Sequence, residues 1–204
     1  MPQHQAVAPR TLRLLETICA IPELSGFNLA GGTALALRIG HRISVDLDFF
    51  GDKNFSTEEI LDLMAGEKPI SIISQHKNIL ILNVQNVKVD FVSYQYPLIA
   101  KPIVEGVIRM LATSDIAAMK LAAIAGRGRK RDFYNLYFML KEFSMKQMID
   151  FYNQKFHDGS EMMVARSLTF FDDADTDEIP RMFAPTVSWE EIKMTTLKEV
   201  KNLY

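Results

Sequence analysis

The sequence predicts an α+β protein in which a small mixed sheet with helices precedes a helical bundle. Short β-branched runs alternate with helical segments up to about residue 112, and almost every later segment has helical periodicity. The chain has 204 residues, of which 48% are hydrophobic and 24% charged, as in ordinary globular proteins of one or two domains. We therefore expect one domain over residues 1–112 and a second, helical domain over residues 113–204.

Turn and capping residues divide the first half into short elements. Pro22 stops a helix, Gly40 closes another, and Gln85-Asn86 leaves a hairpin-length gap between two strands. The elements expected here are helices at 10–20, 33–40 and 55–66 and strands at 26–30, 45–50, 70–74, 79–84 and 87–94.

The second half is predicted to be helical, with two charged stretches between the helices. The basic stretch 127–131 is either a solvated loop or a surface that neutralises the phosphates of RNA or of a nucleotide. The acidic stretch 172–178 is expected to be a loop. The expected helices are 113–126, 132–143, 144–156, 160–171 and 188–203.

Composition excludes several classes of protein. A net charge of −2 excludes a chain that binds polyanions over its whole surface. The single cysteine, Cys19, excludes an intramolecular disulfide framework and a cysteine-rich zinc site, and it fits a reducing compartment. The longest uncharged stretch, Leu24 to Leu37, is shorter than the about 20 residues that span a membrane, and the first ten residues lack a signal-peptide layout. We expect a cytoplasmic protein without membrane association.

The pair Gly31-Gly32 lies between a predicted strand and a predicted helix. Because glycine has no Cβ, the backbone there can approach a phosphate closely, and the helix start presents N–H groups to the anion. The alternative is an ordinary tight turn.

Three aspartates in predicted strands are candidate metal ligands. Asp46 and Asp48 project from the same face of a strand because they are two residues apart. Their charges repel unless a cation neutralises them, and Mg²⁺ binds one or two carboxylates together with substrate phosphates. The alternative is a solvated strand face. Asp90, in a later strand, is either an exposed acid or a third carboxylate, and three carboxylates on two metals would suit nucleotidyl transfer.

These motifs resemble a known superfamily. The Gly-Gly turn, the Asp-x-Asp pair and the distant apolar-Asp-apolar motif are spaced as in the nucleotidyltransferases that include DNA polymerase beta. The segments LAGGTALALRIGHRISVDLDFF, KVDFVSY and DIAAMKLAAIAGRGRKRDFYNLY more closely resemble the AbiEii/AbiGii toxin family. The resemblance covers residues 25–140. It implies a nucleotidyltransferase-like α/β domain followed by a helical domain that closes the nucleotide cleft.

The resemblance also implies roles for individual residues. Asp46, Asp48 and Asp90 would hold Mg²⁺ in a two-metal site and act in catalysis, with Asp90 as candidate base. The other implied nucleotide-binding and catalytic positions are Gly31, Gly32, Thr33, Arg42, Ser44, Lys120 and Asp132. Two positions depart from the family pattern, because Gly32 stands where related enzymes often carry Ser and Asn135 where many carry Asp.

Lys120 is the one charged residue in the apolar segment 116–125. A helix that is apolar on all sides is buried, and a buried ammonium needs a partner. A nucleotide phosphate or Asp132 would supply one. Alternatively, the Lys120 side chain extends along the helix to solvent.

We therefore expect a Mg²⁺-dependent nucleotidyltransferase that moves a nucleotide from an NTP to an acceptor hydroxyl. The resemblance implies RNA, tRNA in particular, as acceptor, and the role of toxin in a bacterial toxin–antitoxin or abortive-infection system with a cognate antitoxin. Two alternatives are a non-catalytic nucleotide- or RNA-binding module and a nucleotidyltransferase that modifies antibiotic-type small molecules.

Overall fold

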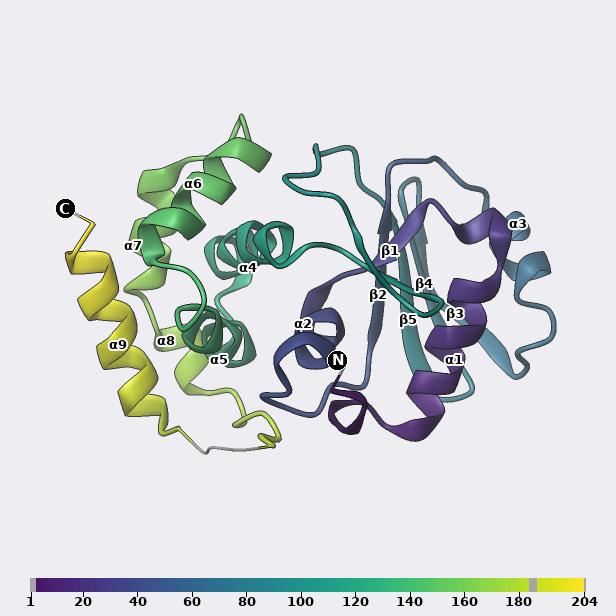
Figure 1. Ribbon diagram of the computed structural model, residues 1–204, viewed down its shortest axis with the longest axis horizontal. Helices are drawn as coiled ribbons and strands as arrows, with labels where there is room; N and C mark the ends of the chain where they lie inside the picture. The colour runs from purple at the N-terminus through teal and green to yellow at the C-terminus, as the bar shows by residue number, and fades with distance from the viewer. Residues whose placement is uncertain (1–2, 184–186, 204) are drawn as a thin grey trace. The chain divides into compact units, whose positions relative to one another are not determined.

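The computed structural model describes residues 3–183 and 187–203. The chain forms two compact units, both visible in Figure 1. The first comprises the described residues up to Pro97 together with Lys101–Leu111, and the second comprises Leu98–Ala100 and the described residues from Ala112. Leu98–Ala100 therefore belongs to the second unit although it precedes the last strands of the first.

A seven-stranded mixed sheet forms the centre of the first unit, in the order β3-β4-β5-β2-β1-β7-β6. The central strands β2 and β5 are parallel, and β1 and β4 flank them in antiparallel orientation. The prediction of an α+β fold with a mixed sheet is confirmed, whereas β6 and β7 were not expected. The strands are β1 (Phe27–Leu29), β2 (Leu47–Gly51), β3 (Ile70–His76), β4 (Ile79–Val84), β5 (Val87–Ser93), β6 (Ile103–Glu105) and β7 (Ile108–Met110).

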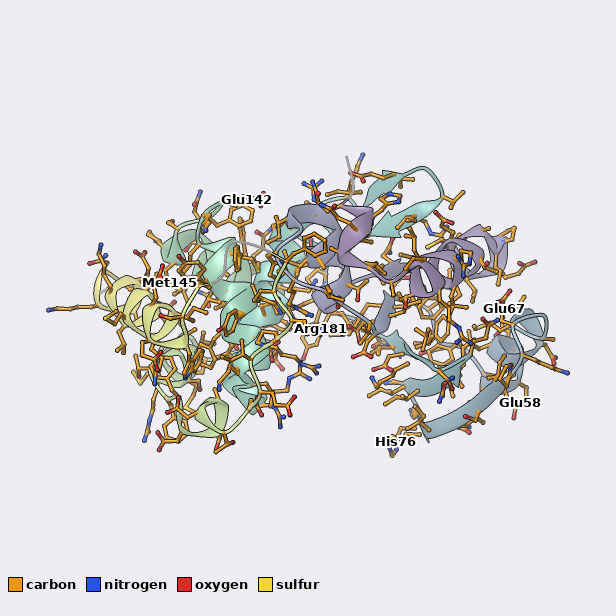
Figure 2. All side chains as sticks on the ribbon, turned by 90° about the horizontal axis from the view of Figure 1, so that it is seen from below. Glu58, Glu67, His76, Glu142, Met145 and Arg181 are labelled. Atoms are coloured by element: carbon orange, nitrogen blue, oxygen red, sulfur yellow. The ribbon has the colours of Figure 1, made fainter. Side chains whose placement is uncertain are left out.

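Helices α1 (Pro9–Ala20) and α2 (Gly31–Ile39) lie on opposite sides of this sheet (Figure 1). The α2 helix ends where Gly40 takes a left-handed conformation with φ of 64°. Helix α3 (Thr57–Leu63) begins at Ser56, whose side chain accepts a hydrogen bond from the Glu59 N–H. Figure 2 shows Glu58 at the start of this helix, Glu67 just beyond it and His76 at the end of β3.

One face of the sheet carries an aromatic core. The Phe49 and Phe91 rings are stacked with centroids 5.4 Å apart, and Phe27 meets Phe91 edge-on at 5.4 Å. Phe49 and Phe91 are fully buried on the adjacent strands β2 and β5. Because side chains alternate along a strand, the opposite face of the same two strands carries Asp48 and Asp90.

The second unit is helical, as predicted. The Ser144 side chain caps α6 (Met145–Lys155) by accepting a hydrogen bond from the Gln147 N–H, and Figure 2 labels Met145, the first residue of this helix. The Trp189 side chain of the last helix packs edge-on against Phe133 and stacks on Tyr134. The helices of the second unit are α4 (Thr113–Arg127), α5 (Lys130–Met139), α6 (Met145–Lys155), α7 (Glu161–Leu168), α8 (Asp172–Asp175) and α9 (Trp189–Lys201).

Two details of the helical unit differ from the sequence expectation. Helix α4 continues through Gly126 and ends where Gly128 takes φ of 51°, so the glycine within the basic stretch ends the helix. The acidic stretch contains the short helix α8 in place of a loop. In the two described ranges, no helix is long and apolar enough to cross a membrane.

Candidate active site

The turn between β1 and α2 lies against the carboxylate of Asp48. Gly31 has φ of 67°, and a Cβ added there would lie 2.2 Å from Asp48 Oδ2. The Ala30 N–H donates a hydrogen bond of 2.8 Å to the backbone carbonyl of Asp48. Both the backbone conformation and the close approach therefore require glycine at position 31.

Gly32 lies against a different side chain, the guanidinium of Arg42. A Cβ at Gly32 would lie 1.9 Å from Arg42 Nη2, so a serine at this position would displace the arginine. Thr33 Oγ1 lies 2.8 Å from Ser44 Oγ and also donates to the backbone carbonyl of Asp46. The structure thus brings together four residues that the resemblance assigned to nucleotide binding, in a buried polar cluster beside the glycine turn.

Asp48 and Asp90 are neighbours across the parallel pair β2–β5. They are register partners, and they project from the same face of the sheet because alternate residues share a face. Asp46 precedes β2 rather than lying within it, since β2 begins at Leu47. The strand expected at 45–50 therefore begins two residues later, and the Asp46 carbonyl accepts a hydrogen bond from the Thr33 hydroxyl; that the two carboxylates share one face stays a prediction.

Asp90 also has a cationic neighbour that the sequence reasoning missed. Lys88 Nζ lies 2.5 Å from Asp90 Oδ2 in an ion pair. Among the described residues, the buried Asp90 Oδ1 has no hydrogen-bond partner. The signal was available, because Lys88 lies two residues before Asp90 in the same predicted strand and so must share its face.

These carboxylates meet part of the requirement for a magnesium site. Within residues 3–183 and 187–203, no three His, Cys, Asp or Glu side chains form a group that could hold a metal ion, so the expected three-carboxylate set is not preformed. The pair Asp48 and Asp90 still fits Mg²⁺, which uses one or two carboxylates together with substrate phosphates. The unpartnered Asp90 Oδ1 is a donor atom of the kind that Mg²⁺ prefers.

Lys120 and Asp132 form a buried ion pair within the second unit. Lys120 Nζ lies 3.1 Å from Asp132 Oδ1, and Arg127 Nε lies 3.1 Å from Asp132 Oδ2. Burial favours the neutral acid, but the charges of Lys120 and Arg127 outweigh it and lower the pKa of Asp132. Of the partners considered for Lys120, the structure supplies Asp132. The catalytic roles of both residues stay predictions.

The basic stretch is largely paired with acids of the same unit. Arg129 Nη2 lies 2.7 Å from Asp177 Oδ1, and the buried Lys130 donates to the backbone carbonyls of Asp175 and Asp177. The acidic stretch therefore forms an ion pair with Arg129 and accepts hydrogen bonds from Lys130, and these contacts join it to the start of α5. The Arg127 and Arg129 side chains are still 52% and 56% exposed, so phosphate binding by this stretch stays a prediction.

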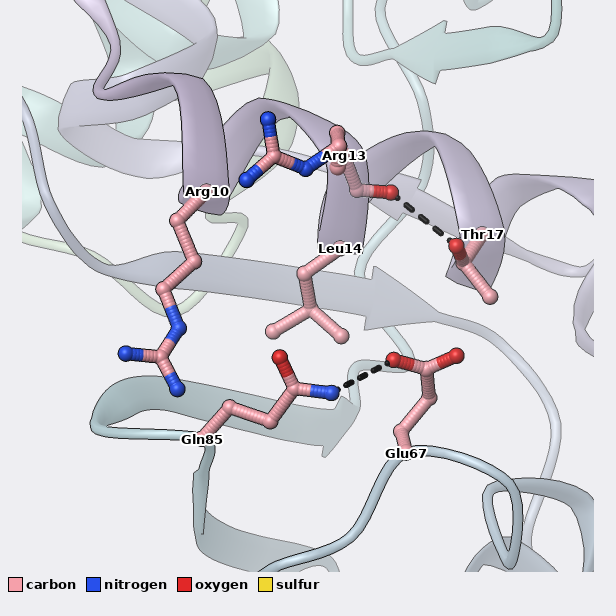
Figure 3. A pocket seen from close by; sticks show the side chains of 6 residues that line it. All are labelled: Arg10, Arg13, Leu14, Thr17, Glu67 and Gln85. Atoms are coloured by element: carbon pink, nitrogen blue, oxygen red, sulfur yellow. Dashed lines mark hydrogen bonds between the residues drawn. The ribbon is translucent and has the colours of Figure 1, made fainter.

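A separate polar pocket of about 390 Å³ lies between α1 and two turns of the first unit (Figure 3). Glu67 and Gln85 face each other there through a hydrogen bond of 2.9 Å, opposite Arg10 and Arg13. None of the predicted site residues is among its lining residues, which are Arg10, Arg13, Leu14, Thr17, Glu67 and Gln85. The pocket is therefore distinct from the Asp48–Asp90 site.

Comparison with known proteins identifies the chain's family. The profile of the AbiEii family, described as a nucleotidyl transferase toxin of a type IV toxin–antitoxin system, matches residues 13–201. The chain belongs to the AbiEii family. It is therefore a nucleotidyltransferase by family, with an NTP as the donor that this enzyme class uses.

Individual proteins are similar to this AbiEii chain in sequence or in fold. An uncharacterised protein of Aquifex aeolicus (strain VF5) is 33% identical over 193 residues, which cover 92% of each chain. The nucleotidyltransferase toxin MenT4 of Mycobacterium tuberculosis H37Rv superposes with a TM-score of 0.63 at 16% identity, over 95% of this chain and 83% of MenT4. JHP933 of Helicobacter pylori superposes with a TM-score of 0.53 at 15% identity, over 97% and 94% of the two chains. The two solved structures share the fold.

Proposed function

We propose that the protein is a Mg²⁺-dependent nucleotidyltransferase toxin that transfers a nucleotide from an NTP to a hydroxyl of RNA, tRNA in particular, and releases pyrophosphate. The observation that carries this proposal is the pairing of Asp48 with Asp90 on adjacent parallel strands, directly beside the Gly31 turn. Family membership supports the toxin role and a cognate antitoxin as partner.

Residues of the first unit would bind the metal ion and the triphosphate. Asp48 and Asp90 would hold Mg²⁺, which when bound polarises the phosphate under attack and stabilises the leaving pyrophosphate. The turn at Gly31 and Gly32 would receive the triphosphate, because neither residue adds a side chain of its own to the turn. The buried Arg42 guanidinium beside Gly32 would offset phosphate charge.

Asp90 is the proposed base for the acceptor hydroxyl. Its Oδ1 has no partner within the described part of the chain, so one carboxylate oxygen is available to accept a proton or a metal ion. Roles at the nucleotide for Asp46, Lys120 and Asp132 remain part of the proposal, as does a cytoplasmic location, which the single thiol Cys19 favours.

A second candidate function is nucleotide or RNA binding without turnover. It is favoured by the Lys88–Asp90 ion pair and by the lack of a preformed three-carboxylate group in the described ranges. The two candidates differ in whether labelled nucleotide becomes covalently attached to an acceptor.

The test is a transfer assay with each labelled NTP, Mg²⁺ and bulk RNA or purified tRNA. Asp48→Asn is expected to lower transfer by roughly two orders of magnitude, because one charge-stabilising group is lost. Asp52→Asn, at an exposed position just beyond β2, is the matched control and should transfer like the wild type. Transfer that survives Asp48→Asn would reject the site, and tight NTP binding without transfer would support the second candidate.

A growth assay tests the toxin role separately. Induced expression of the wild-type chain in bacteria should arrest growth, and Asp48→Asn should relieve the arrest at equal protein level. Normal growth with abundant wild-type protein would count against the toxin role while leaving the transfer reaction open to the assay above.

A further inference from the structure

Lys88 places a cation on one of the two proposed metal-binding carboxylates. Its Nζ lies 2.5 Å from Asp90 Oδ2, within charge-assisted hydrogen-bond distance. The Lys88 side chain is 40% exposed and that of Asp90 only 16%, so the lysine reaches the carboxylate from the solvent side. Solvent therefore reaches this ion pair mainly at the lysine.

Lys88 is a cation on the same face of the sheet as the two carboxylates. Asp90 is flanked by Asp48 on β2 and by Ile81 on β4, so its cross-strand neighbours are an acid and an apolar residue. Lys88 itself is flanked by Asn83 on β4. Two carboxylates on neighbouring strands repel each other, and the ammonium of Lys88 offsets that repulsion.

A divalent ion that uses both carboxylate oxygens of Asp90, the unpartnered Oδ1 and the paired Oδ2, competes with this ammonium for Oδ2. A metal bound at Asp90 Oδ2 would stand within a few ångströms of the lysine charge, and the two cations would repel. The four-carbon stem of Lys88 is flexible and half exposed, so its ammonium can turn to solvent when a metal arrives.

We propose that Lys88 is a positioning residue. Its ammonium is bound to Asp90 Oδ2 while no metal is present, and Mg²⁺ displaces it from that oxygen when the nucleotide binds. The inference rests on the proposed function. The triphosphate brings negative charge to the site, which attracts the metal and offers the displaced ammonium a new partner. Free Mg²⁺ alone therefore binds weakly, and metal and nucleotide bind together.

The experiment is a titration of Mn²⁺ into the full chain without nucleotide, followed by electron paramagnetic resonance. Lys88→Met should bind Mn²⁺ about fivefold more tightly than the wild type, the scale of a partly exposed ion pair. Lys88→Arg keeps the charge and should bind like the wild type. Lys77→Met, in the exposed turn between β3 and β4, is the matched control and should change nothing. With a non-hydrolysable NTP analogue, the difference between Lys88→Met and the wild type should narrow.

Equal or weaker Mn²⁺ binding by Lys88→Met would overturn the inference. Lys88→Gln is a second variant that keeps a polar side chain, and thermal unfolding checks that each variant is folded. A different outcome is that Asp48→Asn and Asp90→Asn lose Mn²⁺ binding while Lys88→Met and Lys88→Gln bind Mn²⁺ like the wild type. That result would support the proposed metal site and reject the proposed role of Lys88. If neither the wild type nor Lys88→Met binds Mn²⁺ with the analogue present, both fall.

Discussion

Gly31 lies against the carboxylate of Asp48, with room for a hydrogen but not for a methyl group. A Cβ at Gly31 would stand 2.2 Å from Asp48 Oδ2, and φ of 67° would strain any other residue. Gly31→Ala should therefore lower the free energy of unfolding by about 1–3 kcal/mol. It should also weaken Mn²⁺ binding, because the new methyl group displaces the Asp48 carboxylate.

The control for this variant is Gly66→Ala. No atom lies within 4 Å of a Cβ built at Gly66, and its φ is not in the left-handed range. Urea unfolding and Mn²⁺ titration should show almost no change there. If Gly31→Ala had the stability and the metal affinity of the wild type, the turn would tolerate a side chain. Glycine would then not be required at position 31 for the geometry of the site.

The ion pair between Lys155 and Asp115 makes a strong prediction about stability in the second unit. Lys155 Nζ lies 2.8 Å from Asp115 Oδ1, and both side chains are fully buried. Asp115 also accepts hydrogen bonds from the N–H groups of Ile99 and Ala100 at 3.0 and 3.1 Å. Lys155→Met should cost about 3–5 kcal/mol, because it leaves a buried carboxylate without its cation.

Lys146→Met in the same helix, α6, is the matched control. Lys146 forms an i,i+4 pair with Asp150 whose side chains are 78% and 59% exposed, and such pairs contribute little. Urea unfolding should place this variant within about 0.5 kcal/mol of the wild type. If Lys155→Met and Lys146→Met changed the free energy of unfolding equally, burial would not be what makes the Lys155–Asp115 pair important for stability.

Asp132 should make stability depend on pH in the acid range. Its pKa is lowered in the folded chain, since Lys120 and Arg127 outweigh the effect of burial. A lowered folded pKa contributes stability above the ordinary Asp value of about 3.9, and this contribution is lost as the pH falls through the folded pKa. Asp132→Asn should therefore be less stable than the wild type at pH 7, by an amount that narrows below about pH 4.

Urea unfolding of both proteins at several pH values between 7 and 3 measures that difference. Between pH 7 and pH 5 the gap should stay nearly constant, because Asp132 is ionised in both folded and unfolded chains there. If the difference in free energy of unfolding disappeared already near neutral pH, or was unchanged at pH 3, the result would contradict a lowered pKa of Asp132.

Much of the sheet was predictable because its signals are local. The hairpin at Gln85-Asn86 was expected from its two-residue gap, and both residues have positive φ, 51° and 65°, as a tight hairpin turn requires. The strands β6 and β7 were missed because each has only three residues, and the hairpin that they form around Gly106 joins the sheet through β1, which is far away in sequence. Short strands of this kind carry little periodicity.

The site was predictable in its residues but not in its contacts. Spacing placed Asp48 and Asp90 on strands, and their register then made them neighbours. Spacing could not show that β2 starts after Asp46, nor that the Asp46 carbonyl accepts a hydrogen bond from Thr33, thirteen residues earlier in the chain. Pairing of the basic and acidic stretches was likewise invisible, since Arg129 and Asp177 meet only through the packing of distant helices.

The most direct measurement of the central claim is a crystal structure of the wild-type chain with Mn²⁺ and a non-hydrolysable NTP analogue, with the metal located by its anomalous scattering. We expect Mn²⁺ coordinated by oxygens of both Asp48 and Asp90 and by the triphosphate, with Lys88 Nζ withdrawn from Asp90 Oδ2. A nucleotide bound elsewhere, or a metal that touches neither carboxylate, would contradict the proposed active site.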